Sequence, residues 1–171
     1  SVAALALFLG RPVIWPVLGL VYVALPCATA IWLREQGAHG MSVVLWSLVI
    51  VWATDTGAYL FGKSIGGSRL APRISPKKTW AGLIGGTACG TLAGGAFAAI
   101  TGLASIVILA GLSFILTFAA HAGDLAESAI KRHFQVKDSG TLIPGHGGIL
   151  DRVDGLVFVW PVMVVLSLLH G

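Results

Sequence analysis

The stretch "PGHGGILDRVDG", near the end of the chain, combines a glycine-rich loop with two aspartates. Asp151 and Asp154 are three residues apart, a spacing that places both carboxylates on one face of a helical turn. Carboxylate oxygens suit hard cations such as Mg²⁺, which commonly takes one or two carboxylates together with waters and substrate phosphates. Gly147 and Gly148 let backbone N–H groups approach a ligand closely. The stretch predicts a cation and phosphate site, in which His146 is either a ligand contact or a residue that braces the loop.

The segment "HAGDLAESAIKRHFQVKDSG" is typical of an amphipathic helix that begins near Asp124. Asp124, then Glu127 or Ser128, and then Lys131 recur at intervals of three or four residues, which aligns them in one polar stripe. A carboxylate followed by a hydroxyl and then by Lys131 and Arg132 suits a cation bound to a phosphate. The simpler alternative is an interfacial helix whose polar face is solvated.

The stretch "SPKKTWAG" predicts the start of a helix near Thr79, because Pro76 restricts the backbone just before it. Lys77, Lys78 and the Thr79 hydroxyl would then lie beside the free N–H groups of a helix N-terminus, which readily bind anions. The alternative is that the two lysines only mark the boundary of a membrane span.

Asp55 lies inside an apolar segment, two turns before its polar end. A carboxylate near the centre of a membrane helix costs about 2.5 kcal/mol or more, so it needs a partner or a wet cavity. Tyr59 is four residues further on and shares its helix face. We therefore expect Asp55 to line a polar cavity, with neutralisation by a neighbouring helix as the alternative.

The elements that must position these residues are membrane helices. Of the 171 residues, 56% are hydrophobic and 11% charged, and the mean hydropathy is +0.90, far above that of a soluble domain. We predict an all-α fold, a polytopic integral membrane helical bundle that forms one catalytic region over 1–171. The five predicted spans are Val13–Leu33, Met41–Gly62, Thr79–Thr101, Leu103–Ala122 and Val153–His170.

The charged residues indicate how this bundle is oriented. Two polar connections, 63–78 and 123–154, are separated by two spans and therefore lie on the same side of the membrane. Counting Arg11, all Lys and Arg residues except Arg34 fall on that side, and so do all acids except Glu35. By the positive-inside rule this side is the cytoplasm. A bacterial inner membrane is the expected location, with the site facing the cytoplasm.

The first apolar run, Val2–Leu9, is too short to span a membrane, and we expect a longer parent chain with further N-terminal segments. Cys27 and Cys89 lie in apolar segments and are expected to be packing residues rather than a disulfide or metal pair. Small residues over 82–95 recur at three- and four-residue spacing, which is typical of close helix packing. That seam serves either an internal contact or a homodimer.

Residues 128–155, "SAIKRHFQVKDSGTLIPGHGGILDRVDG", resemble the signature of the phosphatidate cytidylyltransferases (CDP-diacylglycerol synthases). The family pattern has a serine before Lys-Arg, then Lys-Asp, His-Gly-Gly and Asp-Arg-x-Asp, and every element is present with family spacing. "DTGAYLFGK" and "SPKKTWAG" are similar to two further family stretches. In the second, Ala81 replaces the glutamate that the family usually carries, so any role of that carboxylate is missing or taken over elsewhere.

The resemblance implies transfer of CMP from CTP to phosphatidic acid, with Mg²⁺ and with CDP-diacylglycerol and pyrophosphate as products. Asp124 and Asp151 would hold the metal, Asp154 would bind it or orient a ligand, and a second cation is left open. The basic residues would bind the phosphates of CTP and of the lipid. The candidate catalytic residues are Asp124, Lys131, Arg132, Asp151 and Arg152, and the candidate substrate-binding residues are Asp55, Tyr59, Lys77, Lys78, Thr79, Ser128, Lys137, Asp138, His146, Gly147 and Gly148.

The expected partners are CTP, phosphatidic acid and the lipid bilayer, with no nucleic acid. The nearest rival function is a CTP-dependent lipid kinase of the polyprenol type, in which CTP would donate its γ-phosphoryl group. A membrane transporter is a remote rival, because an intramembrane acid such as Asp55 also suits transport. A transporter would not require the glycine loop together with the Asp-Arg-x-Asp cluster.

Overall fold

The computed structural model describes residues 14–136, 148 and 150–170, without the side chains of 150–152 and 170. Long helices make up almost all of this part of the chain, which confirms the predicted all-α class. The elements, in order, are α2 (Ile14–Arg34), the short 3-10 helix η1 (Gly37–His39), α3 (Gly40–Ser64), β1 (Arg69–Ala71), β2 (Ser75–Thr79), α4 (Trp80–Thr101), α5 (Ile106–His133) and α6 (Leu150–His170).

The length and composition of these helices are those of a polytopic membrane protein. Within the described residues, α2, 37–64, α4 and α5 are long and apolar enough to cross a membrane. The apolar part of α6, Val153–Leu169, is shorter. Many large apolar side chains are exposed on the outer faces of the helices, as expected where lipid rather than water is the surroundings.

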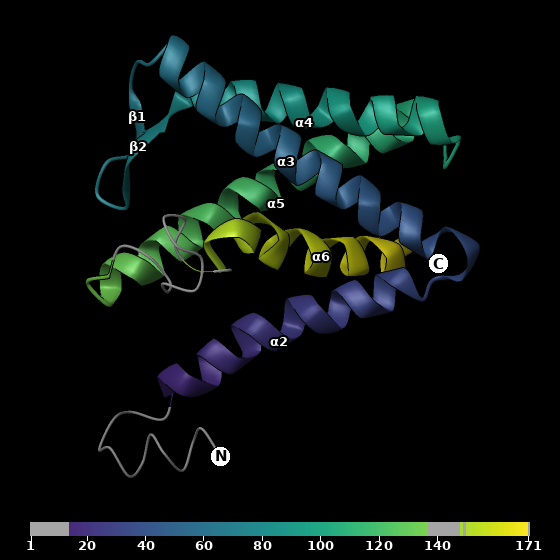
Figure 1. Cartoon of the computed structure of the whole chain (residues 1–171), viewed down its shortest axis with the longest axis horizontal. Coiled ribbons are helices and arrows are strands. Elements are labelled where there is room, and N and C mark those ends of the chain that lie inside the picture. Colours follow the sequence, from purple (N-terminus) through teal and green to yellow (C-terminus); the bar gives the residue numbers. More distant parts are fainter. Residues whose placement is uncertain (1–13, 137–147, 149, 171) are drawn as a thin grey trace.

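The helices run back and forth, so that the polar connections gather at one end of the bundle (Figure 1). The strand pair, the end of α5 and the start of α6 lie at that end, and the α2–α3 and α4–α5 connections lie at the other. Ile50 and Val51 on α3, Leu116 on α5 and Val159 on α6 form the buried centre. The placement of both polar connections on one side agrees with the sequence prediction.

The glycines of α4 form an internal seam rather than a free face. The contact of α4 with α3 is the most extensive between any two described helices. A Cβ atom at Gly82 would lie 2.8 Å from the carbonyl oxygen of Ala58, and one at Gly86 would lie 2.7 Å from that of Thr54. Only glycine permits such backbone approach. The small residues of α4 are thus used inside the chain.

A two-stranded hairpin in the first polar connection was not predicted. β1 and β2 pair antiparallel, with Arg69 opposite Thr79 and Ala71 opposite Ser75. The Arg132 Nε–H donates to the Ile74 carbonyl oxygen at 3.2 Å and ties the turn of the hairpin to α5. The strands are too short to give a clear alternation of polar and apolar residues in the sequence. Part of the hairpin's stability comes from this contact with α5.

The separate amphipathic helix predicted to begin near Asp124 is wrong. α5 is one helix that continues from the fourth apolar segment through Asp124 to His133. The sequence becomes more polar after Gly123, but the helix continues through it. A glycine stands at this position because α6 crosses α5 closely there. A Cβ atom at Gly123 would collide with the Asp154 carbonyl oxygen. The glycine therefore serves helix packing and does not end the helix.

Candidate active site

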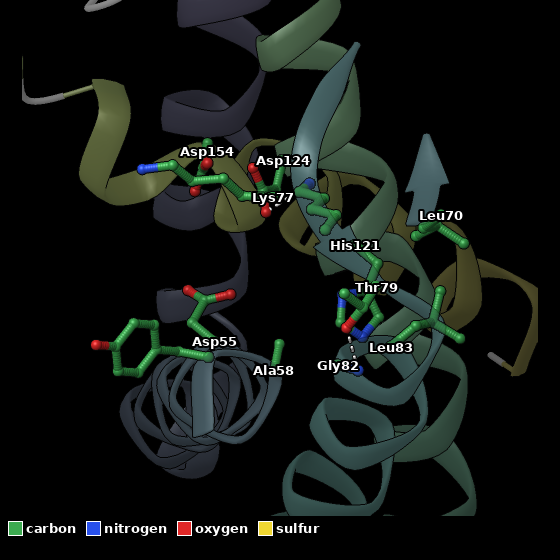
Figure 2. A pocket seen from close by; sticks show the side chains of 12 residues that line it. Asp55, Ala58, Leu70, Lys77, Thr79, Gly82, Leu83, His121, Asp124 and Asp154 are labelled. Carbon is green, nitrogen blue, oxygen red and sulfur yellow. Dashed lines mark hydrogen bonds and ion pairs between the residues drawn. The ribbon is translucent and has the colours of Figure 1, made fainter. Parts of the chain in front are cut away.

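A cavity of about 310 Å³ lies between α3, the hairpin, α4, α5 and α6 at the polar end of the bundle (Figure 2). It brings together residues that are up to a hundred positions apart in the sequence. Several of its walls are apolar, formed by Ala58, Leu70 and Leu83. The lining residues that the sequence patterns predicted are Asp55, Tyr59, Lys77, Lys78, Thr79, Asp124 and Asp154.

Three helices each contribute one carboxylate to the cavity. Asp55 comes from α3, Asp124 from α5 and Asp154 from α6, and Figure 2 shows the three side chains around a common space. Asp124 acts electrostatically on both of the others. The Asp154 Oδ1 atom also accepts a hydrogen bond from the Gly155 N–H at 2.8 Å. Carboxylates that repel one another in a confined space favour the binding of a cation between them.

The hairpin supplies the opposing positive charge. Lys78 Nζ lies 2.6 Å from Asp124 Oδ2, and the two side chains are 20% and 33% exposed. Lys77 is the neighbouring residue on β2; it is exposed and also lines the cavity. Among the described residues, Lys77 makes no ion pair. The two lysines therefore differ: one is already engaged with a carboxylate and one is available.

Thr79 ends the hairpin and caps α4, and the predicted helix start near Thr79 is confirmed. Its side chain is buried, and its hydroxyl oxygen accepts a hydrogen bond from the Gly82 N–H at 3.1 Å. One of the N–H groups expected to bind an anion is thus already satisfied by the cap. The cap fixes the junction that carries the two lysines at the rim of the cavity.

His121 is a cavity residue that the sequence analysis missed. It is 9% exposed, lies one helical turn before Asp124 on α5, and lines the cavity together with Leu83 of α4. Its Nε2 atom is buried and has no hydrogen-bond partner among the described residues. The spacing of His121 and Asp124, at i and i+3, was the available signal, because it places both on one helix face.

Other predicted residues lie further along α5, outside this lining. Lys131 Nζ pairs with Glu127 Oε2 at 2.8 Å, and Arg132 contacts the hairpin turn. Ser128, the residue after Glu127, is partly exposed, and Gly148 is buried. The predicted residues Lys137, Asp138, His146 and Gly147 lie outside the described residues, as do the side chains of Asp151 and Arg152, whose backbone forms the first turn of α6.

A second cavity, of about 680 Å³, lies between α2, α5 and α6. Its walls are almost entirely apolar, with Leu18, Val157 and Phe158 among the lining residues. Glu127 and Lys131 also line it, one and two turns along α5 from Asp124. An apolar space thus borders the same helix as the polar cavity.

The donor set of the polar cavity fits Mg²⁺. Asp124 and Asp154 offer carboxylate oxygens from two helices, and Asp55 lies nearby. Within residues 14–136, 148 and 150–170, no group of three or more His, Cys, Asp or Glu side chains is arranged to hold a metal ion. Mg²⁺ is commonly bound by one or two carboxylates, with waters and substrate phosphates completing its octahedron. The two carboxylates are therefore sufficient on the protein side.

Comparison with known proteins gives a consistent family. The model of the cytidylyltransferase family matches residues 5–170. A phosphatidate cytidylyltransferase of Brucella melitensis is 45% identical over 152 residues, which are 84% of this chain and 53% of that protein. A phosphatidate cytidylyltransferase of Staphylococcus aureus is 47% identical over 133 residues, which are 77% of this chain and 51% of that protein. The chain spans about half the length of the curated relatives it matches.

Proposed function

Because the chain belongs to the cytidylyltransferase family, we propose that it carries the catalytic region of a phosphatidate cytidylyltransferase. CTP and phosphatidic acid react to give CDP-diacylglycerol and pyrophosphate. The observation that carries this proposal is the convergence of Asp124, Asp154, Lys77 and Lys78 on one cavity at the polar end of an apolar bundle. Such a cavity suits a reaction between a water-soluble polyanion and a lipid that stays in the membrane.

The chemistry requires little proton transfer. An oxygen of the phosphatidate monoester, already anionic at neutral pH, forms a bond to the α-phosphorus of CTP. The bond from that phosphorus to the bridging oxygen breaks, and pyrophosphate leaves with the electron pair. The main obstacle is the repulsion between two polyanions, so positive charge and in-line positioning supply most of the rate enhancement.

Asp124 and Asp154 are the proposed holders of Mg²⁺, together with Asp151, which precedes Asp154 by three residues. The ion would neutralise charge on the CTP phosphates and on the leaving pyrophosphate. Binding by carboxylates from both α5 and α6 would fix the nucleotide between these helices. A second cation is compatible with the same cavity, since Asp55 adds a third carboxylate to its lining.

The basic residues divide between the two substrates in this proposal. Lys77 and Lys78 bind the triphosphate, supported by their position on the cavity rim. Lys131, Arg132 and Arg152 bind the lipid phosphate, and Lys131 is supported by its place in the lining of the second cavity. The remaining proposed substrate contacts, whose roles are less specific, are Asp55, Tyr59, Thr79, Ser128, Lys137, Asp138, His146, Gly147 and Gly148.

The second cavity is the proposed place for an acyl chain of phosphatidic acid. Its apolar lining matches a hydrocarbon chain, and Lys131 at its edge offers a positive charge toward an anionic headgroup. The lipid could then present its phosphate near Asp124 while its tail remains between α2 and α6. The polar end of the bundle would face the cytoplasm, where CTP is available, which is supported by the excess of Lys and Arg there.

Labelled CTP tests the reaction directly. The purified protein, in nanodiscs that contain phosphatidic acid, is incubated with Mg²⁺ and with CTP labelled in either the α- or the γ-phosphate. The α-label should enter the lipid and the γ-label should appear in pyrophosphate. Entry of the γ-label into lipid, with release of CDP, would instead identify a CTP-dependent lipid kinase. No transfer of either label would refute the cytidylyltransferase function for this chain.

A further inference from the structure

We infer that Lys78 is a tethered cation that occupies Asp124 until a divalent cation replaces it. The released ammonium group then moves to the phosphates of the nucleotide. Metal and nucleotide would therefore assist each other's binding through this one side chain. The inference rests on the proposed function for the identity of the nucleotide, but the exchange at Asp124 can be measured without any turnover.

The geometry of the pair is the starting point. The ammonium nitrogen of Lys78 lies 2.6 Å from Asp124 Oδ2, which is direct contact between opposite charges. That nitrogen is inaccessible to solvent, although the cavity lies beside it. A phosphate that enters the cavity therefore cannot reach the ammonium group unless its contact with Asp124 opens. A cation cannot bind that carboxylate oxygen unless Lys78 leaves.

The charges of the cavity explain why the lysine would be held there. Asp55, Asp124 and Asp154 repel one another, and the Lys78 ammonium group reduces that repulsion. A divalent cation brings twice the charge and several ligand positions, so it can replace the ammonium group between the carboxylates. The displaced ammonium group then needs a new anionic partner, and nucleotide phosphates supply one.

This exchange makes binding cooperative by linkage. A divalent cation that binds alone must break the Lys78–Asp124 pair and leave the ammonium group without its carboxylate. With nucleotide present, the same ammonium group gains a phosphate, so the cation binds more tightly. Removal of the lysine should abolish the cost of breaking the pair. The variant should therefore bind a divalent cation more tightly in the absence of nucleotide.

The experiment is a titration of the full chain with Mn²⁺, monitored by electron paramagnetic resonance, in phosphatidylcholine nanodiscs without nucleotide. Lys78→Met should bind Mn²⁺ about tenfold more tightly than the unmodified protein, a change within the usual range of coupling between sites. Lys77→Met is the matched control. It removes the same charge from the adjacent residue of β2, which also lines the cavity but makes no ion pair among the described residues. Its Mn²⁺ affinity should change by about twofold or less, because only the long-range charge effect remains.

Two further variants make the result decisive. Asp124→Asn should abolish the tight Mn²⁺ binding, both alone and combined with Lys78→Met. Lys78→Gln provides a second form of the key variant if Lys78→Met does not fold, as judged by circular dichroism and thermal unfolding. An equal gain of affinity in the Lys77 and Lys78 variants would overturn the exchange, as would no gain in the Lys78 variants. Tight Mn²⁺ binding that survives Asp124→Asn would also overturn it.

The outcome is separable from that of the labelling experiment. If the label transfer fails while Lys78→Met still tightens Mn²⁺ binding, the function is wrong but the exchange at Asp124 stands. If label transfer succeeds while the Mn²⁺ titration shows no difference between the two lysines, the function stands and the exchange is wrong.

Discussion

Two cavities lie against the same helix, α5, and they differ in the number of charged side chains in their linings. The one beside Asp124 collects three carboxylates and two lysines from four separate elements. The one beside Ile130 and Phe134 is larger, at about 680 Å³ against 310 Å³, and is lined mainly by hydrocarbon. Asp124 and Lys131 are separated by about two turns of α5. Under the proposed function, this difference lets one helix border the site of a soluble polyanion and the site of a lipid.

Of the variants that test this difference between the cavities, removal of a carboxylate from the polar cavity should have the largest effect on activity. Asp124→Asn keeps the size of the side chain but loses the charge that would hold the cation. CMP transfer should fall by about a thousandfold, the scale of losing a key electrostatic contact in the transition state. The rate is measured as α-label entering lipid. Glu35→Gln is the matched control, because Glu35 is exposed in the connection between α2 and η1 and is not part of the cavity lining.

Normal transfer by the Asp124→Asn protein would mean that the catalytic cation does not bind in this cavity. An equal loss in the Glu35→Gln protein would point to a general effect of charge. Asp151→Asn is expected to behave like Asp124→Asn, which rests on the sequence motif alone.

The carboxylates of the polar cavity illustrate what the sequence could reveal. The role of Asp55 as a cavity residue was predictable because a carboxylate in an apolar helix needs a partner or a wet cavity. The role of Asp154 was predictable because it follows a glycine-rich loop. The spacing of Asp124 and Lys131 gave a polar stripe, but not which cavity each would line. Asp124 and Lys131 lie seven residues apart on α5, yet Asp124 lines the polar cavity and Lys131 the apolar one, a division that depends on how the other helices pack around α5.

The hairpin and His121 show where sequence reasoning ended. The hairpin depends on the Arg132 contact with Ile74, which joins residues 58 positions apart and leaves no local pattern. His121 lies in a run of apolar and small residues, and its role as a cavity residue depends on how α4 packs against it. A Cβ atom at Gly86 would lie 3.0 Å from the His121 ring. Tertiary contacts of this kind are decided by packing and not by periodicity.

A smaller effect is expected from Lys77, the cavity lysine that makes no ion pair within the described part of the chain. Lys77→Ala should raise the KM for CTP about tenfold, since a hydrogen bond to a charged group contributes about 1.5 kcal/mol or more. The KM for phosphatidic acid should not change. Arg73→Ala is the control, because Arg73 is exposed in the turn of the same hairpin and is not part of the cavity lining. A change in the KM for the lipid alone would mean that Lys77 binds the lipid and not CTP.

The apolar cavity can be tested by filling it. Gly19 lines that cavity on α2, and a Cβ atom there would meet nothing within 4 Å. Gly19→Leu should therefore leave the fold intact and raise the KM for long-chain phosphatidic acid about fivefold, the loss expected from one poorly buried stretch of hydrocarbon. A short-chain phosphatidic acid should be affected less, and CTP not at all.

Gly111→Leu is the matched control for this variant. Gly111 lies on α5 in a third, apolar cavity near the other end of the bundle, and a Cβ atom there also meets nothing within 4 Å. If Gly111→Leu changed the KM for long-chain lipid as much as Gly19→Leu does, the effect would come from general membrane packing. The α2–α5–α6 cavity would then not be the place of the acyl chain.

The smallest predicted effect concerns how the polar cavity is held together. At the junction of β2 and α4, its lysine-bearing wall is capped by a hydrogen bond from the Gly82 N–H to the Thr79 hydroxyl, whereas the apolar cavity is bounded by packing between helices. Thr79→Ala should lower the free energy of unfolding by about 1 kcal/mol, the usual cost of losing a helix cap. Thermal unfolding in detergent measures this, and Thr79→Ser should recover most of it because serine keeps the accepting oxygen. Equal unfolding temperatures for the alanine and serine variants would mean that the methyl group of Thr79, rather than its cap, stabilises the junction between β2 and α4.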